Sequence, residues 1–193
     1  TKSDLILRDL ELLKKINQQT KCVVQMTLTT FDENLCQKLE PGVCTTQRRI
    51  EVLKELHKNG IPTIVWLTPI LPFINDSQEN ILKILEECHE AGVKGIICFG
   101  MGVTLREGSR EYYYKQLDRL FPGMKEKYQM TYNDQYTLNS PHNRDLMNLF
   151  FKKCQEYQMM CNYLEIFEYL QEFEEKTPIK KKDIHDFEQL SLF

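Results

Sequence analysis

Two hydroxyl side chains follow a short apolar segment near the start of the chain. The segment 23–26 is apolar except for Gln25, and Thr27 and Thr29 come directly after it. In parallel α/β architectures, ligands bind at the carboxyl ends of strands, because the side chains there face a crevice. We therefore expect ligand chemistry just after Met26, where threonine hydroxyls can donate and accept hydrogen bonds. The alternative is that both threonines only terminate a strand.

A charged element comes next, Glu40-Pro41-Gly42 followed by Arg48 and Arg49. A carboxylate and a guanidinium form strong charge-assisted hydrogen bonds. We interpret Glu40 and Arg48 as a structural ion pair or backbone clamp that fixes a loop at the rim of the sheet, in preference to a direct catalytic role. Arg49 is interchangeable with Arg48 in this interpretation.

The elements that must position these residues are strands alternating with helices. Apolar strands are expected at 22–30, 61–67 and 93–99, and helices at 5–16, 45–59 and 76–91. Gly60 and Gly92 follow two of the helices, where a positive φ costs little. The right-handed crossover rule makes the strands of such βαβ units parallel, so their carboxyl ends share one rim. The residues expected to meet there are Thr27, Thr29, Pro69 and the segment 100–102.

The rest of the chain is expected to be mostly helical. Helices are expected at 110–120, 143–157 and 163–173, with a polar connector at 129–140. We divide the chain into a parallel α/β portion at 1–128, a helical extension at 129–175 and a flexible tail at 176–193. Three parallel strands cannot close a barrel, and an open sheet leaves unpaired edges, so we expect further strands upstream of Thr1 in the intact protein.

Composition disfavours several classes of protein. The net charge of -3 over 193 residues gives no global attraction to nucleic acid or anionic lipid. Every apolar run is far shorter than the roughly 20 residues of a membrane span, and nothing resembles a signal peptide, so we expect a cytoplasmic protein without a membrane partner. The seven cysteines are scattered and form no CxxC pair, which favours reduced, buried thiols over disulfides or an intrinsic metal site.

The order and spacing of the motifs resemble the spore photoproduct lyase-like branch of the radical SAM enzymes. The matching segments, between residue 1 and about residue 128, are Thr1-Lys2-Ser3-Asp4 with Arg8-Asp9, Thr27-Leu28-Thr29-Thr30, Glu40-Pro41-Gly42 with Arg48-Arg49-Ile50, and Pro69-Ile70-Leu71-Pro72 with Asn75-Asp76. The resemblance implies an α/β fold, namely the C-terminal part of a partial (β/α)6 TIM-like barrel with parallel strands, plus C-terminal helices. It also implies a 4Fe-4S cluster and S-adenosylmethionine, whose reductive cleavage yields a 5′-deoxyadenosyl radical that abstracts hydrogen from substrate.

The same resemblance implies individual roles. Lys2 would pair with the carboxylate of S-adenosylmethionine, a task that suits a point-charge ammonium. Thr27 and Thr29 would hydrogen-bond its amino acid or ribose part. Gly100 and Gly102 would let the backbone approach the adenine closely, because no Cβ intervenes, or would serve only a turn. Glu40 and Arg48 match the family's Glu-Pro-Gly…Arg element and keep the structural role given above, and no catalytic residue is assigned.

The chain departs from the family in one respect, because it lacks the CxxxCxxC loop that supplies three cluster ligands. Thiolates hold such clusters, so no metal ligand is expected in this chain and no cofactor is expected to bind it alone. In the family this loop lies earlier in the chain. We therefore expect a fragment that is inactive by itself and part of a radical SAM enzyme when intact. A non-catalytic accessory or binding module is the alternative.

The last five residues resemble the peptide by which bacterial DNA polymerases and repair proteins bind the sliding clamp. Such a peptide would bury Leu190, Leu192 and Phe193 in an apolar groove of the clamp, while the Gln189 amide fixes its register. The alternative is that these residues finish a helix that begins near Lys182. The clamp interpretation points to DNA independently of the family resemblance. The hypotheses to be tested are therefore that damaged DNA is the substrate and that the sliding clamp is a partner.

Overall fold

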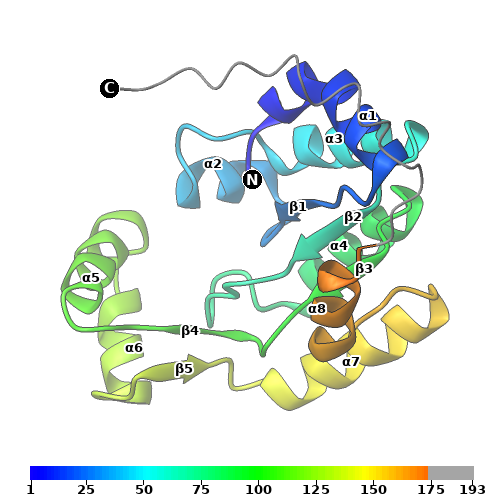
Figure 1. Cartoon of the computed structure of the whole chain (residues 1–193). Helices are drawn as coiled ribbons and strands as arrows, with labels where there is room; N and C mark the ends of the chain where they lie inside the picture. The colour runs from blue at the N-terminus through cyan, green and yellow to red at the C-terminus, as the bar shows by residue number, and fades with distance from the viewer. Residues whose placement is uncertain (174–193) are drawn as a thin grey trace, which may run out of the picture.

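A three-stranded parallel sheet forms the centre of the protein. The computed structural model describes residues 1–173, and it is a mixed α/β fold. The strands β1 (Val24–Thr27), β2 (Thr63–Trp66) and β3 (Gly95–Ile97) lie side by side in this order, as Figure 1 shows. Met26 lies opposite Val65, which lies opposite Ile96. The predicted parallel strands are therefore confirmed, although each is shorter than the apolar run that indicated it.

One face of the sheet is covered by helices and carries the main aliphatic core. The covering helices are α1 (Leu10–Gln19), which follows the 3-10 helix η1 (Asp4–Asp9), then α3 (Thr46–Lys58), α4 (Gln78–Glu90) and α7 (Asn143–Glu156), which packs on α4. Thr45 caps α3 and Ser77 caps α4, each through a side-chain oxygen that accepts a backbone N–H. Met26, Val65 and Ile96 are fully buried against these helices. The helices predicted at 45–59, 76–91 and 143–157 are therefore confirmed, whereas the first half of the helix predicted at 5–16 is the 3-10 helix η1.

Within residues 1–173, the opposite face of the sheet is covered by one short helix, α8 (Tyr163–Gln171). Ile166 of this helix packs with Ile64 and Ile97, and Met160 just before it pairs with Gly95 as a short parallel bridge. A Cβ on Gly95 would lie 2.8 Å from the Met160 Cβ, so only glycine allows this approach. The expected helical tail therefore packs on the sheet, as predicted.

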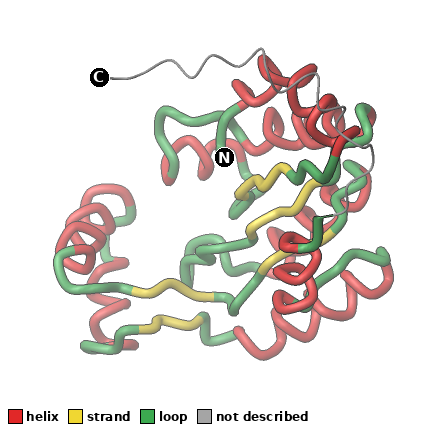
Figure 2. The backbone as a smooth tube through the Cα atoms, viewed as in Figure 1, coloured by secondary structure: helices red, strands yellow, loops and turns green. Residues whose placement is uncertain are grey.

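A separate unit, residues 102–139, projects from the sheet and is called here the hairpin unit. Its antiparallel strands β4 (Gly102–Thr104) and β5 (Thr137–Asn139) enclose helices α5 (Ser109–Leu120) and α6 (Met124–Tyr132), and Figures 1 and 2 show both helices standing away from the remaining elements. We call the rest of the described chain the sheet body. The predicted connector at 129–140 is wrong, because this segment contains the end of α6 and all of β5. The segment looked polar in the sequence, but its Tyr132 is buried together with the neighbouring Tyr128.

The predicted boundary between residues 128 and 129 falls inside α6. The short helix α2 (Glu33–Leu39), capped by Asp32, was not predicted, and it leads directly into Glu40. Within residues 1–173, no helix combines the length and apolar character needed to cross a membrane.

Candidate functional site

A buried arginine ties the carboxyl end of β1 to the loop that follows α2. Arg49 lies in the first turn of α3 and is fully buried. Its Nη1 donates to the carbonyl oxygen of Thr27 at 3.0 Å, and its Nε donates to the carbonyl oxygen of Cys44 at 2.9 Å. Its Nη2 lies 2.5 Å from Oε2 of Glu40. A buried guanidinium is tolerated only when its charge and its donors are satisfied, and these three partners meet that requirement.

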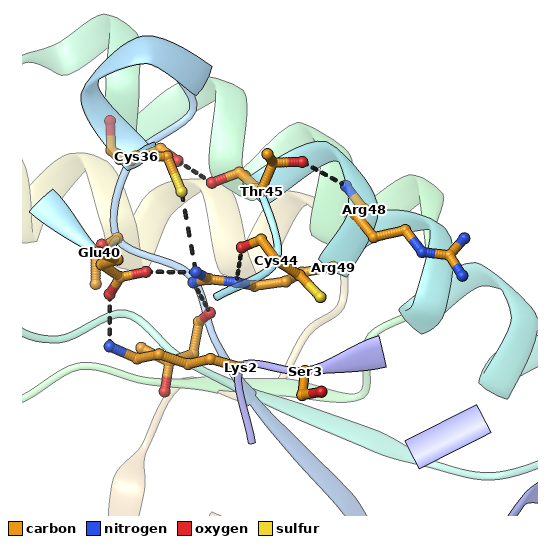
Figure 3. A network of polar contacts seen from close by, with 12 residues as sticks. Lys2, Ser3, Cys36, Glu40, Cys44, Thr45, Arg48 and Arg49 are labelled. Carbon is orange, nitrogen blue, oxygen red and sulfur yellow. Dashed lines mark hydrogen bonds and ion pairs between the residues drawn. The ribbon is translucent and has the colours of Figure 1, made fainter. Parts of the chain in front are cut away.

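Glu40 is shared between two cations. Its Oε1 lies 2.5 Å from Nζ of Lys2, while its Oε2 binds Arg49, so the carboxylate bridges the start of the chain and α3 (Figure 3). Arg48 points away from Glu40 in Figure 3 and pairs instead with Asp4 and Glu51. The predicted ion pair between Glu40 and Arg48 is therefore wrong, because Glu40 pairs with Arg49 instead. Arg49 takes that role because the α3 backbone turns its side chain toward the sheet.

The two cations change the ionisation of this carboxyl. Burial alone would raise the pKa of Glu40, but hydrogen bonds from Lys2 and Arg49, together with their charges, outweigh it and hold the pKa below its ordinary value. Glu40 is therefore ionised at neutral pH. One carboxylate between two cations leaves the group of three with one excess positive charge beside the rim of the sheet.

A pocket of about 310 Å³, called here the rim pocket, opens at the carboxyl ends of β1 and β2. Lys2, Thr29, Glu40 and Pro69 line it on the side of the sheet body, and residues of α5 line it on the other side. The structure thus brings together Lys2 and Thr29, which the sequence predicted as ligand-binding residues. Thr27 ends β1 nearby and is held through its carbonyl oxygen, but it does not line this pocket.

Two asparagines fix the loop that carries Thr29. Nδ2 of Asn75 donates to the carbonyl oxygen of Thr29 at 2.8 Å, and Nδ2 of Asn80 donates to the same oxygen at 3.0 Å. Oδ1 of Asn80 also accepts the backbone N–H of Phe31 at 2.7 Å. The sequence placed Asn75 only within a segment that matches the family, and it gave Asn80 no role. The only sequence signal was that both amides follow an apolar rim loop, where backbone groups lack sheet partners.

Gly100 and Gly102 lie at a second pocket, of about 420 Å³, which borders the rim pocket at Pro69. Gly100 has a φ of 147°, a conformation that favours glycine. A Cβ on Gly102 would lie only 2.6 Å from the carbonyl oxygen of Leu138 in β5. The pairing of β4 with β5 therefore requires glycine at position 102. The close approach of this backbone to an adenine stays a prediction.

The residues of this chain fit the two implied cofactors differently. Among residues 1–173, no three His, Cys, Asp or Glu side chains gather as metal ligands, so this part of the chain does not fit a 4Fe-4S cluster. The rim pocket does present an ammonium and a threonine to an amino acid ligand. The clamp-binding residues predicted at Gln189, Leu190, Leu192 and Phe193 lie outside the described residues.

Comparisons with known proteins give relatives without an assigned activity. No protein-family model matches the chain. An uncharacterized protein of Mycobacterium tuberculosis (strain ATCC 25618 / H37Rv) is 30% identical over 132 residues, which is 68% of this chain and 38% of the relative. An uncharacterized protein of Methanocaldococcus jannaschii is 40% identical over 76 residues, or 39% of this chain and 28% of the relative. An uncharacterized protein of Acidianus two-tailed virus is 29% identical over 115 residues, which is 58% of this chain and 37% of the relative. The chain therefore matches less than two fifths of the length of each relative.

Proposed function

We propose that this chain is the C-terminal portion of a radical SAM enzyme, in which the three parallel strands belong to a partial (β/α)6 barrel. The observation that carries the proposal is that Lys2 and Thr29, two residues whose sequence positions match the family's motifs, line one pocket at the carboxyl rim of a parallel sheet. Ligands bind at this rim in parallel α/β folds.

The two neighbouring pockets have complementary character. The rim pocket carries the Lys2 ammonium, whereas the described residues that line the second pocket include no charged side chain and do include Phe99, which is 58% exposed. S-adenosylmethionine combines a charged amino acid end with a neutral, flat adenine. A ligand of this kind, lying across Pro69, would place its carboxylate at Lys2 and its ring beside Phe99 and Gly100. Aromatic side chains stack readily on such rings.

The residues of this chain act by binding and positioning. Lys2 would hold the ligand carboxylate, and Thr29 would hydrogen-bond the same part of the ligand. Glu40 and Arg49 keep the Lys2 ammonium and the end of β1 in place. The bound S-adenosylmethionine, with a cluster held by an upstream CxxxCxxC loop, would supply radical chemistry by its reductive cleavage, so the chain alone is expected to be inactive.

The test uses the longer protein that includes any upstream CxxxCxxC loop, purified without oxygen. We expect about four irons and four sulfides per chain, as the cluster type requires, and 5′-deoxyadenosine on reduction with S-adenosylmethionine. Lys2→Met should weaken S-adenosylmethionine binding about tenfold, as loss of a charge-assisted hydrogen bond predicts. Lys14→Met, on helix α1 at a position that lines neither pocket, is the matched control and should bind normally. An intact protein without a cluster, or equal effects of the two variants, would reject the proposal.

A second proposal concerns DNA and the replication clamp, and its motivation is the sequence of residues 189–193. In this proposal a cytoplasmic protein is brought to damaged DNA by the clamp, either as the lyase-like enzyme or as a non-catalytic accessory module. Clamp capture by the protein should be lost when Leu192→Ala and Phe193→Ala are combined. Equal capture by the parent and the double variant would remove this partner.

A further inference from the structure

One wall of the rim pocket is built from the end of α2 and from α5. Lys38 comes from the last turn of α2, and Tyr112, Gln116 and Arg119 come from one face of α5, where residues three or four positions apart are neighbours. Phe121, just after α5, completes this wall. The wall is aromatic and cationic. Its α5 residues lie across the pocket from Lys2 and Thr29, and the Lys38 side chain reaches Phe121 from α2.

The positive charges of the two walls are balanced differently. Among the described residues that line the rim pocket, Glu40 is the only acidic one, and both of its oxygens are already bound by Lys2 and Arg49. Lys38 and Arg119 have neutral partners instead. Nζ of Lys38 lies 4.2 Å from the centroid of the Phe121 ring, and Nε of Arg119 donates to Oε1 of Gln116 at 3.1 Å. In the described part of the chain, neither cation forms an ion pair with a carboxylate.

These neutral contacts orient the two cations without cancelling their charge. Both residues also lie in the last turn of a helix, where a cation interacts favourably with the helix dipole. That interaction leaves the ammonium protons of Lys38 and the guanidinium nitrogens Nη1 and Nη2 of Arg119 available as donors. Tyr112 is 67% exposed beside them and offers an apolar surface. The wall therefore fits an anionic group attached to a ring or another apolar body.

We propose that the substrate of the rim pocket carries an oxyanion, a phosphate or a carboxylate, which Lys38 and Arg119 bind while its apolar part lies against Tyr112 and Phe121. The inference rests on the proposed function, which places the cofactor carboxylate at Lys2 and leaves the wall formed by α2 and α5 to the substrate. Arginine binds both oxyanions through two parallel N–H donors, and lysine adds a point charge. The cofactor carboxylate is left to Lys2, across the pocket.

The experiment measures binding of three small probes by two-dimensional NMR titration of the protein. Phenyl phosphate and benzoate share a ring and differ in the oxyanion, and phenol supplies the ring without one. Arg119→Gln and Lys38→Gln remove each charge at similar side-chain length. Lys115→Gln is the matched control, because Lys115 is exposed on the same helix and does not line the pocket. The NMR spectrum of each variant shows whether it folds. Lys38 and Arg119 are both exposed and lie on different helices, so each variant tests the proposal independently of the other.

We expect phenyl phosphate or benzoate to bind at least about tenfold more tightly than phenol, as hydrogen bonds to charged groups predict. Each pocket variant should weaken oxyanion binding about tenfold, and Lys115→Gln should leave it unchanged. The tighter of the two oxyanions identifies the group. Binding of phenol as tight as that of both oxyanions, or equal losses in all three variants, would overturn the proposal. The probes need neither cluster nor S-adenosylmethionine, so this failure would leave the proposed function standing.

Discussion

The sheet body and the hairpin unit are stabilised by different kinds of side chain. The core of the sheet body is mainly aliphatic and includes Met26, Leu53 and Ile96 without exposed surface. The smaller core of the hairpin unit includes Tyr128, Tyr132 and Leu138, and the hydroxyls of both tyrosines donate to backbone carbonyl oxygens. Aliphatic side chains gain stability from burial alone, whereas a buried tyrosine also needs a partner for its hydroxyl. The hairpin unit therefore depends on particular hydrogen bonds to a greater degree than the sheet body does.

Contacts at the boundary between the two regions illustrate the same difference. The hydroxyl of Tyr128 donates to the carbonyl oxygen of Pro72 at 2.6 Å and lies 3.1 Å from the hydroxyl of Tyr113. The ring of Phe73 packs against the ring of Tyr128, with centroids 5.8 Å apart. The rim pocket lies between the two regions, so its shape depends on how these few contacts hold the hairpin unit against the sheet body.

The largest effect should come from the buried charge pair of the rim. Glu40→Gln leaves the fully buried guanidinium of Arg49 without its counter-charge, and we expect the free energy of unfolding to fall by about 3 kcal/mol. Urea denaturation measures this loss. Glu51→Gln removes a carboxylate from the exposed pair with Arg48 and is the control. Equal denaturation midpoints for the two variants would contradict the view that the sheet body depends on this buried pair.

A smaller loss is expected where the hairpin strands come closest. Gly102→Ala would put a Cβ 2.6 Å from the carbonyl oxygen of Leu138, so β4 and β5 must separate, at a cost of about 2 kcal/mol. Hydrogen exchange should accelerate in both strands before it does so in β1 to β3. Thr104→Ala, at an exposed position of the same strand, should leave exchange unchanged. Uniform acceleration across the sheet would show that the two regions open together.

Removal of one hydroxyl sharpens the comparison further. Tyr128→Phe keeps the ring but leaves the carbonyl of Pro72 without this donor, and we expect a loss of about 1 kcal/mol. Tyr112→Phe changes an exposed tyrosine on α5 and serves as the reference. Thermal unfolding of both variants gives the difference. A Tyr128→Phe protein as stable as the reference would mean that the aromatic core is held by its rings alone.

The smallest effect should be a pH dependence confined to the acid range. The pKa of Glu40 is lowered in the folded protein, so its ion pairs stabilise the fold fully above the ordinary pKa of 4.5 and lose this contribution as pH falls through the lowered value. The stability difference between the parent and Glu40→Gln should therefore shrink on acidification below that pH. Urea midpoints measured across this range test the sign. A difference that grows on acidification would contradict the assignment.

Periodicity in the sequence determined the parallel strands and most helices of the sheet body. Apolar runs bounded by Thr45, Ser77 and Gly92 placed β1 to β3, α3 and α4, because burial on both faces of a sheet requires continuous apolar segments. The polar appearance of residues 129–140 concealed α6 and β5. Tyrosine is apolar in its ring and polar at its tip, so only a surrounding core decides which part governs its placement.

Several rim residues were also predicted from the sequence. Residue types and positions indicated Thr29, Glu40 and an arginine, and the family resemblance indicated Lys2. Only the tertiary structure decided that Arg49 and not Arg48 binds Glu40, since adjacent helical residues point in directions about 100° apart, at 3.6 residues per turn, and packing selects which one faces the sheet. It also decided that α5 closes the rim pocket opposite Lys2. That contact joins residues more than a hundred positions apart, and no local pattern in the chain encodes such a distance.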